Sequence, residues 1–174
     1  MDLATLPALL LFLGEGRSGY DVRRLFQTTP IGIFSDSPGA IYPALARLER
    51  AGLLTSEAQP SGRNRRVYRR TSAGEAALNE WLKAPVSCET VERRPREIEL
   101  KYVIVASHLG DAQATRFIAE AGRAFERRIA ELEAARANKE LTAPSVAALD
   151  LGIRLFRTRR EWCREIESRE DRGK

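Results

Sequence analysis

Five arginines lie within a stretch of eight residues, and no acidic residue lies among them. They are Arg63, Arg65, Arg66, Arg69 and Arg70. Guanidinium groups bind phosphate oxygens through charge-assisted hydrogen bonds, so such a cluster suits the backbone of a nucleic acid. Charge runs are more often solvated surface, and Arg69 and Arg70 could instead pair with acids such as Glu57. The elements around the cluster decide between these interpretations.

Other kinds of site have little support in the sequence. His108 is the only histidine, which excludes the usual histidine-based triads and multi-histidine metal sites. Cys88 and Cys163 cannot form a disulfide framework and lack metal-ligand spacing. Gly14 and Gly16 lack the strand and the third glycine of a phosphate-binding loop. Because no group of residues offers both a base and a nucleophile, we expect no enzyme activity, no metal and no cofactor.

The cysteines and the histidine each have an ordinary interpretation. Cys163 recurs on an apolar helical stripe, so we expect it to pack as a small hydrophobic residue. Cys88 lies near Arg93 and Arg94 in the sequence, which leaves a redox role open. His108 is interpreted as a surface or capping residue.

Length and composition fit a soluble chain of one ordinary domain or two small ones. The chain has 174 residues, of which 43% are hydrophobic and 30% charged, and its net charge is +5. A mildly basic balance permits nucleic acid binding without proving it. The longest apolar run, from Leu6 to Leu13, is far shorter than a bilayer span, so we expect no membrane segment and no signal peptide.

The elements that would present the arginines follow from hydrophobic spacing and punctuation in the first half of the chain. We expect helices over residues 3–13 and 19–28, a third that starts at Ser37 and ends before Gly52, and a fourth capped by Thr71 or Ser72. Two β-like runs, Leu53 to Ala58 and Arg65 to Thr71, flank a tip rich in Pro, Ser, Gly and Asn and predict a hairpin.

This order of helix, helix, helix, hairpin, helix is that of a winged helix-turn-helix. The third helix of such a domain can enter the major groove with its N-terminal residues against base edges. The hairpin, or wing, can then bring the arginine cluster to phosphates or to the minor groove.

The second half of the chain predicts a helical domain after a break. Residues 85–95 contain Pro85 and Pro95 around a charged run, and we interpret them as a linker. Helices are expected over residues 96–109, from 111 to about 140, and from Thr142 or Ser145 to about 170. Ile118, Phe125 and Leu132 recur every seven residues, which favours helical pairing and dimerisation. The predicted domains are therefore 1–84, which binds DNA, and 96–174, which dimerises.

Several motifs of the first half occur in a fixed order. They are Ser18-Gly19-Tyr20-Asp21, Ser37-Pro38-Gly39-Ala40-Ile41-Tyr42-Pro43-Ala44-Leu45, Arg47-Leu48-Glu49, Gly52-Leu53-Leu54, Gly62-Arg63-Asn64-Arg65-Arg66-Val67-Tyr68 and Thr71-Ser72-Ala73-Gly74. In this order and spacing they resemble the PadR family of transcriptional regulators, over residues 3–83. Residues 96–168 resemble the longer PadR type in layout only. The resemblance implies a cytoplasmic bacterial homodimer that usually represses transcription and often leaves DNA when a small effector binds.

The candidate DNA-contacting residues come from two helix starts and the wing. They are Tyr20, Ser37, Gly39, Ala40, Tyr42, Arg47, Arg63, Asn64, Arg65 and Arg66. Hydroxyl groups at helix starts can donate to phosphates, and the resemblance implies this role for the tyrosines, although Tyr42 could also pack beneath the third helix. Two such reading heads related by two-fold symmetry would bind a pseudo-palindromic operator.

One departure from the family's pattern concerns the third helix. Ala40 and Ala46 stand where family members often carry polar or basic residues. Thymine methyl contacts, phosphate contacts and DNA shape would then supply more of the specificity.

Four aromatic residues are candidates for a pocket that binds a small aromatic or hydrophobic effector. They are Trp81, Tyr102, Phe117 and Trp162. At helical spacing such residues more often form core. Two other functions also stay open: a protein-interaction module with an incidental basic wing, and a small-molecule-binding or sequestering protein that no longer reads DNA.

Overall fold

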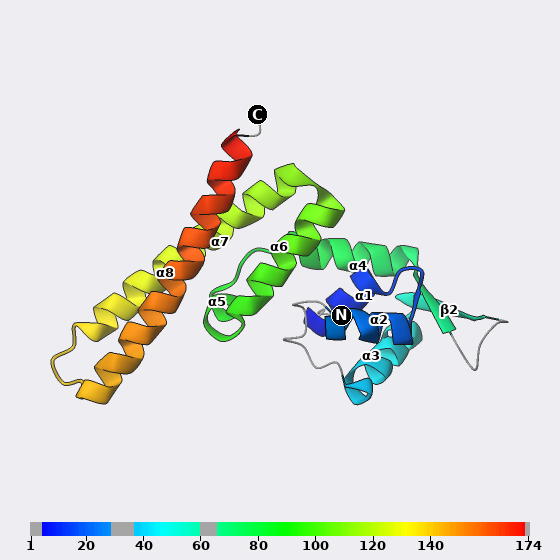
Figure 1. The fold of residues 1–174 in the computed structure, drawn as a ribbon, viewed down its shortest axis with the longest axis horizontal. Helices are drawn as coiled ribbons and strands as arrows, with labels where there is room; N and C mark the ends of the chain where they lie inside the picture. Colours follow the sequence, from blue (N-terminus) through cyan, green and yellow to red (C-terminus); the bar gives the residue numbers. More distant parts are fainter. Residues whose placement is uncertain (1–4, 29–36, 60–65, 173–174) are drawn as a thin grey trace. The chain divides into compact units, whose positions relative to one another are not determined.

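The computed structural model describes residues 5–28, 37–59 and 66–172, and its described residues form two units, Met1–Ala84 and Pro85–Lys174 (Figure 1). None of its described helices is long and apolar enough to cross a membrane. Each unit has its own core and is described by itself.

The first unit has the element order of a winged helix. It contains α1 (Thr5–Leu13), β1 (Arg17–Ser18), α2 (Gly19–Thr28), α3 (Pro38–Arg50), β2 (Leu54–Ala58), β3 (Arg66–Arg70) and α4 (Ser72–Lys83). The predicted order of three helices, a hairpin and a fourth helix is confirmed. Strand β1 was not predicted, because two residues are too few for a periodic pattern.

The three strands form one antiparallel sheet in the order β1-β3-β2. Ser56 lies opposite Tyr68 and Ala58 opposite Arg66, so the described part of the hairpin ends at the Ala58–Arg66 pair. On its other edge β3 pairs with β1, where Arg17 lies opposite Tyr68. The wing is thereby joined to the segment that leads into α2.

Aliphatic side chains from the helices and β2 meet in the core of the first unit. The fully buried members include Leu9, Leu10, Leu11, Phe26, Ile41, Leu45, Leu48, Leu54 and Leu78. Ile41, Leu45 and Leu48 form the predicted stripe of α3, which places the opposite face of that helix toward solvent.

The start of α4 approaches the start of β2 very closely. A Cβ atom on Gly74 would lie 2.0 Å from the carbonyl oxygen of Leu53. Thr71 caps the helix by accepting from the Gly74 N–H at 3.0 Å, and its hydroxyl donates to the Gly52 carbonyl at 2.7 Å. Only glycine fits this junction, which fixes the base of the hairpin to α4.

The second unit consists of helices. They are α5 (Cys88–Arg93), α6 (Pro95–Leu109), α7 (Asp111–Arg136) and α8 (Ala143–Arg172). Residues 85–95 were expected to be a linker, but they contain α5, which Ser87 caps by accepting from the Thr90 N–H. The helix expected to run to about residue 140 ends at Arg136.

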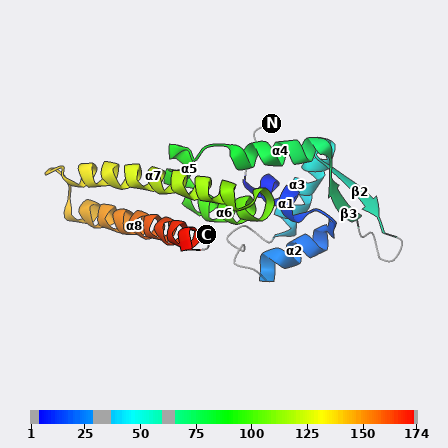
Figure 2. The same cartoon turned by 90° about the horizontal axis from the view of Figure 1, so that it is seen from above.

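Helices α7 and α8 lie side by side and run antiparallel (Figure 2). Phe125 and Phe156 pack with their ring centroids 6.1 Å apart, and Ile118, Phe125 and Cys163 are fully buried. The seven-residue apolar repeat of α7 therefore packs partly against its own neighbour α8. Whether a second copy also packs against it stays a prediction.

Candidate nucleic-acid interface

The N-terminal turn of α3 is exposed and well capped. The hydroxyl of Ser37 accepts from the Gly39 N–H at 3.2 Å, and the Ser37 carbonyl accepts from the Ala40 N–H at 2.9 Å. Pro38 occupies the first helical position, where its missing N–H has no cost. Ser37 and Gly39 are exposed and Ala40 is half-buried, so this turn can approach a groove or an anion.

Two tyrosines flank this turn. Tyr20 at the start of α2 is 61% exposed, and Tyr42 on α3 is 43% exposed. A Cβ atom on Gly19 would lie 2.5 Å from Cε1 of Tyr42, so the Tyr42 ring rests directly on the start of α2. Tyr42 therefore both packs and remains accessible, which combines the two interpretations that the sequence offered.

A reciprocal cap fixes the start of α2 and with it Tyr20. The Asp21 carboxylate accepts from the Ser18 N–H at 3.1 Å and from the Ser18 hydroxyl at 2.7 Å. The Ser18 oxygen in turn accepts from the Asp21 N–H at 3.3 Å. This arrangement matches the chemistry of a capping box and satisfies backbone donors at the helix start.

Strand alternation divides the described arginines of the wing between two faces. Arg66, Tyr68 and Arg70 share one face of β3, whereas Arg69 lies on the other. Tyr68 is buried on the first face, while Arg66 and Arg69 are exposed. The face of Arg66 and Arg70 is the one that meets the carboxylates of the helices.

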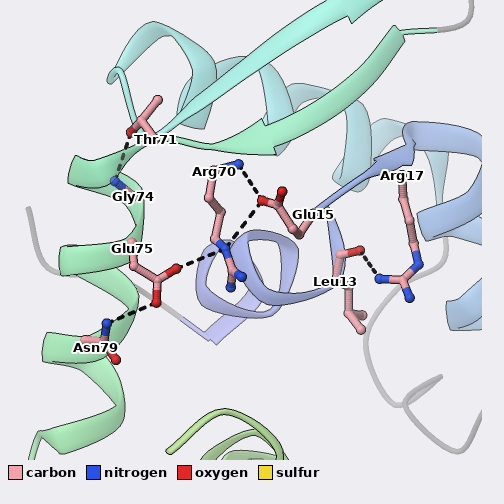
Figure 3. Close-up of polar contacts among 8 residues, drawn as sticks. All are labelled: Leu13, Glu15, Arg17, Arg70, Thr71, Gly74, Glu75 and Asn79. Atoms are coloured by element: carbon pink, nitrogen blue, oxygen red, sulfur yellow. Dashed lines mark hydrogen bonds and ion pairs between the residues drawn. The ribbon is translucent and has the colours of Figure 1, made fainter.

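Arg70 is clamped at the base of the wing (Figure 3). Its backbone N–H donates to Oε2 of Glu15 at 2.7 Å, and its Nε lies 3.2 Å from Oε2 of Glu75 and 3.5 Å from Oε2 of Glu15. Asn79 donates to the other oxygen of Glu75 at 3.1 Å. The suggested pairing of Arg70 with an acid such as Glu57 is therefore corrected, because the partners come from the turn after α1 and from α4.

Glu49 connects its own helix, α3, to the outer part of the wing. Its Oε1 accepts from the Ser56 hydroxyl at 2.6 Å and from Nη2 of Arg66 at 3.1 Å. Burial raises the pKa of the Tyr68 hydroxyl, and the nearby Glu49 carboxylate raises it further. Glu49 was not among the predicted site residues, because its contacts depend on strand register.

The predicted DNA-contacting residues are only partly described. Tyr20, Ser37, Gly39, Ala40, Tyr42, Arg47 and Arg66 all lie in the first unit, and all except half-buried Ala40 are exposed. Arg63, Asn64 and Arg65 lie outside the described residues. The structure thus brings the starts of α2 and α3 together.

The four aromatic residues proposed for an effector pocket are divided between the units. Trp81 lies on α4 in the first unit and is half-buried. In the second unit, Tyr102 and Trp162 meet edge to face with centroids 5.6 Å apart. Phe117 is buried, and Nζ of Lys101 lies 5.5 Å from its ring centroid. Tyr102, Phe117 and Trp162 therefore pack within the second unit.

A hollow that the sequence did not indicate lies along α7 and α8. Its volume is about 830 Å³, and its lining is mostly charged. Arg160 and Arg164 line it and both bind the Glu126 carboxylate, at 2.6 and 3.3 Å. Because these cations already face an acid, the hollow is not an obvious site for an anion.

Two buried groups of the second unit have shifted pKa values. Burial lowers the pKa of the Lys101 ammonium to about 8, although Glu97 and Glu120 oppose the shift. Burial raises the pKa of the Cys163 thiol to about 12, so this thiol stays protonated. A protonated, buried thiol agrees with the expectation that Cys163 packs as a small hydrophobic residue. No cluster of metal-ligating side chains occurs in the ranges that the structure describes.

Comparison with known proteins finds a family whose model matches much of the first unit. Residues 9–80 match the model of the transcriptional regulator PadR-like family. The match lies within the N-terminal unit, Met1–Ala84. The matched residues run from α1 into α4, so they include both exposed helix starts and the whole wing.

Part of the chain also resembles a curated regulator. The transcriptional regulator Rv3488 of Mycobacterium tuberculosis is 62% identical over 49 residues, which make up 28% of this chain and 46% of that protein. The match thus spans about half the length of this curated relative.

Solved structures similar to the chain include three from Bacillus species. PadR of Bacillus subtilis in complex with operator DNA is 20% identical with a TM-score of 0.45, over 95% of this chain and 98% of that one. The same protein with p-coumaric acid is 20% identical with a TM-score of 0.41, over 97% and 99%. The PadR-like regulator BC1756 of Bacillus cereus is 21% identical with a TM-score of 0.42, over 97% and 99%.

Proposed function

We propose that this protein binds double-stranded DNA in a sequence-specific manner and regulates transcription. The observation that carries the proposal is the exposed, capped start of α3 between Tyr20 and Tyr42, within a unit that matches the PadR-like family. In this proposal α3 enters the major groove, and the tyrosine hydroxyls donate to phosphates on either side.

The residues divide into three roles. Ser37, Gly39 and Ala40 approach base edges or phosphates at the helix start, and exposed Arg47 contacts a phosphate further along α3. Ala40 and Ala46 offer methyl groups to thymine, so DNA shape supplies much of the remaining specificity. The wing arginines, from Arg63 to Arg66, bind phosphates or the minor groove.

The second unit supports self-association into a homodimer. Leu151 and Leu155 lie one helical turn apart on α8, and their side chains are 54% and 50% exposed. Large aliphatic residues exposed at this spacing favour a helical partner, and a second copy of α8 offers the same stripe. A two-fold dimer would place its reading heads on half-sites about 34–36 Å apart, or a multiple of that, on a pseudo-palindrome.

The regulator is proposed to act in the cytoplasm as a repressor that a small aromatic or hydrophobic effector releases from DNA. Release requires only that the effector bind two dimer conformations with different affinity, a coupling of about 1–3 kcal/mol. Trp81, Tyr102, Phe117 and Trp162 stay the candidate contacts for such an effector.

Fluorescence anisotropy tests the proposal. A duplex from the region upstream of the protein's own gene is compared with a scrambled duplex, at salt concentrations from about 50 to 200 mM. We expect log affinity to fall linearly with log salt for both duplexes, and the native duplex to bind at least ~10³-fold tighter at physiological salt. Equal, weak binding of both duplexes would contradict sequence-specific reading of that region.

The alanines of α3 favour one alternative, a small-molecule-binding protein that uses the winged helix without specific DNA readout. The side chains of Ala40 and Ala46 are methyl groups, so neither can hydrogen-bond to a base. Tight effector binding together with sequence-blind DNA binding would support this alternative.

A further inference from the structure

We propose that Glu49 is a positioning residue for DNA reading, which holds the outer end of the wing against the recognition helix through Arg66 and Ser56. This inference rests on the proposed function. Glu49 touches the wing from α3, the helix that would occupy the major groove, so it sets the spacing between the two elements that approach DNA.

The geometry of one carboxylate oxygen carries the argument. Oε1 of Glu49 accepts from Ser56 on β2 at 2.6 Å and from Arg66 on β3 at 3.1 Å, so it binds both strands of the hairpin. Arg66 belongs to the last described pair, with Ala58, before residues 60–65 connect the strands. Glu49 therefore acts at the end of the wing that adjoins Arg63 and Arg65.

The position of Glu49 within its helix gives an independent reason to assign it a tertiary role. It lies in the last turn of α3, where the helix dipole disfavours an acid and favours bases such as Arg47 and Arg50. A carboxylate here gains nothing from its own helix. Its contacts with the wing offset the unfavourable interaction with the helix dipole.

Arg66 can serve Glu49 and DNA at the same time. A guanidinium group has five N–H donors, and Glu49 engages Nη2. The Arg66 side chain is 54% exposed, whereas that of Glu49 is 29% exposed. The carboxylate thus engages one nitrogen of the arginine and leaves more than half of its side chain exposed, where a phosphate could bind.

The alternative to positioning is simple competition, in which Glu49 neutralises Arg66 and weakens DNA binding. The two roles predict opposite signs for Glu49→Gln. Loss of a positioning contact lowers affinity for the preferred duplex, whereas loss of a competing charge raises affinity for every duplex.

The experiment measures anisotropy with the preferred and the scrambled duplex for four variants of the full chain. They are Glu49→Gln, Arg66→Ala, the double variant and Glu57→Gln. Glu57 is an exposed acid on the same wing, on the opposite face of β2 from Ser56, so its variant controls for the loss of one negative charge.

We expect Glu49→Gln to lower the affinity ratio of the two duplexes about tenfold, and Glu57→Gln to leave that ratio unchanged. Arg66→Ala should reduce the salt slope by about one and also lower the ratio. In the Arg66→Ala background, Glu49→Gln should change the ratio less than about threefold, because its main partner is gone. If Glu49→Gln instead tightens both duplexes as Glu57→Gln does, the positioning role is wrong.

Hydrogen exchange without DNA separates this inference from the proposed function. Amides of β2 and β3 should exchange at least about threefold faster in Glu49→Gln than in Glu57→Gln, because the link to α3 is lost. Unchanged exchange would overturn the positioning role even if the wild-type protein reads DNA. A wild-type protein without duplex preference would overturn the proposed function itself, whatever the exchange rates show.

Discussion

The two units use charged side chains in opposite ways. In the first, Arg70 and Glu49 each join elements that are distant in the sequence, and each contact fixes one end of the wing. In the second, ion pairs repeat along two helices, such as Arg160 with Glu126 and Arg157 with Glu133. A few contacts therefore hold the wing in the first unit. The second unit spreads its ion pairs along α7 and α8, where some are exposed, such as Arg157 with Glu133, and others are partly buried, such as Arg160 with Glu126.

Two glycine substitutions, one in each unit, are expected to give the largest difference in the free energy of unfolding. Gly74→Ala places a Cβ atom 2.0 Å from the Leu53 carbonyl oxygen, so the junction of α4 and β2 must shift. We expect a loss of about 1–3 kcal/mol in the free energy of unfolding, measured by urea denaturation. Gly152→Ala on α8 is the matched control, since its Cβ meets only Leu132 Cδ1 at 3.6 Å. It should stabilise by about 0.5–1 kcal/mol, and a similar loss in both variants would contradict the account.

The clamp on Arg70 should be the next most sensitive feature. Glu15→Ala removes the acceptor for the Arg70 backbone N–H and one of the two acids beside its guanidinium. Because the lost hydrogen bond involves a charged group, we expect unfolding to become easier by about 1.5 kcal/mol in urea denaturation.

Glu133→Ala is the corresponding change in the second unit. Both Glu133 and Arg157 are exposed, so their ion pair should contribute less than about 0.5 kcal/mol. If the two variants lose the same free energy of unfolding, the contrast between the units fails for ion pairs.

Much of the fold could be predicted because it depends on local patterns. The stripe of Ile41, Leu45 and Leu48, the cap at Ser37 and the punctuation at Gly52 identified α3 with its neighbours. Short elements were different. β1 consists of two residues, and α5 lies between prolines in a charged run, so neither produces a periodic signal.

The candidate site was predictable only where it follows from helix starts. Tyr20 and Tyr42 lie near the starts of α2 and α3, and both side chains are exposed. Glu15, Glu49 and Glu75 could not be identified in advance, because their partners depend on strand register and on contacts across up to 55 positions of sequence. Sequence reasoning assigned such partners by proximity, which gave Glu57 for Arg70.

Lys101 is a buried charge of the second unit, and its shifted pKa predicts a pH dependence. The folded pKa of Lys101 is about 8, below the usual lysine value of 10.5, so the unfolded chain binds more protons between these values. Stability should therefore rise with pH, by up to about 1 kcal/mol between pH 8 and 9. The pH range ends at 9 because, at higher pH, the Cys163 thiol lowers the free energy of unfolding.

Lys101→Met is the control for this pH dependence. The variant should lose the rise in the free energy of unfolding, measured by urea denaturation at pH 7.5, 8.2 and 9. An unchanged rise in the variant would assign the pH dependence to another group.

Close packing of Tyr42 on Gly19 gives the smallest expected change in stability but a visible one in binding. Gly19→Ala forces the Tyr42 ring to move, because its Cε1 lies 2.5 Å from the added Cβ. The Tyr42 side chain is 43% exposed, so its ring can swing outward. We expect the preferred duplex to bind about tenfold more weakly in anisotropy, with the scrambled duplex affected less. Equal weakening for both duplexes would place Tyr42 outside specific reading.

The central claim is that the first unit reads DNA sequence, and selection from a pool of random duplexes tests it most directly. The full-length protein is immobilised, bound duplexes are amplified over several rounds, and the survivors are sequenced. We expect enrichment of one motif with two-fold symmetry and half-sites about 10–10.5 base pairs apart, or a multiple of that spacing. A pool that stays random after repeated rounds, at salt concentrations where the protein retains DNA, would contradict the claim.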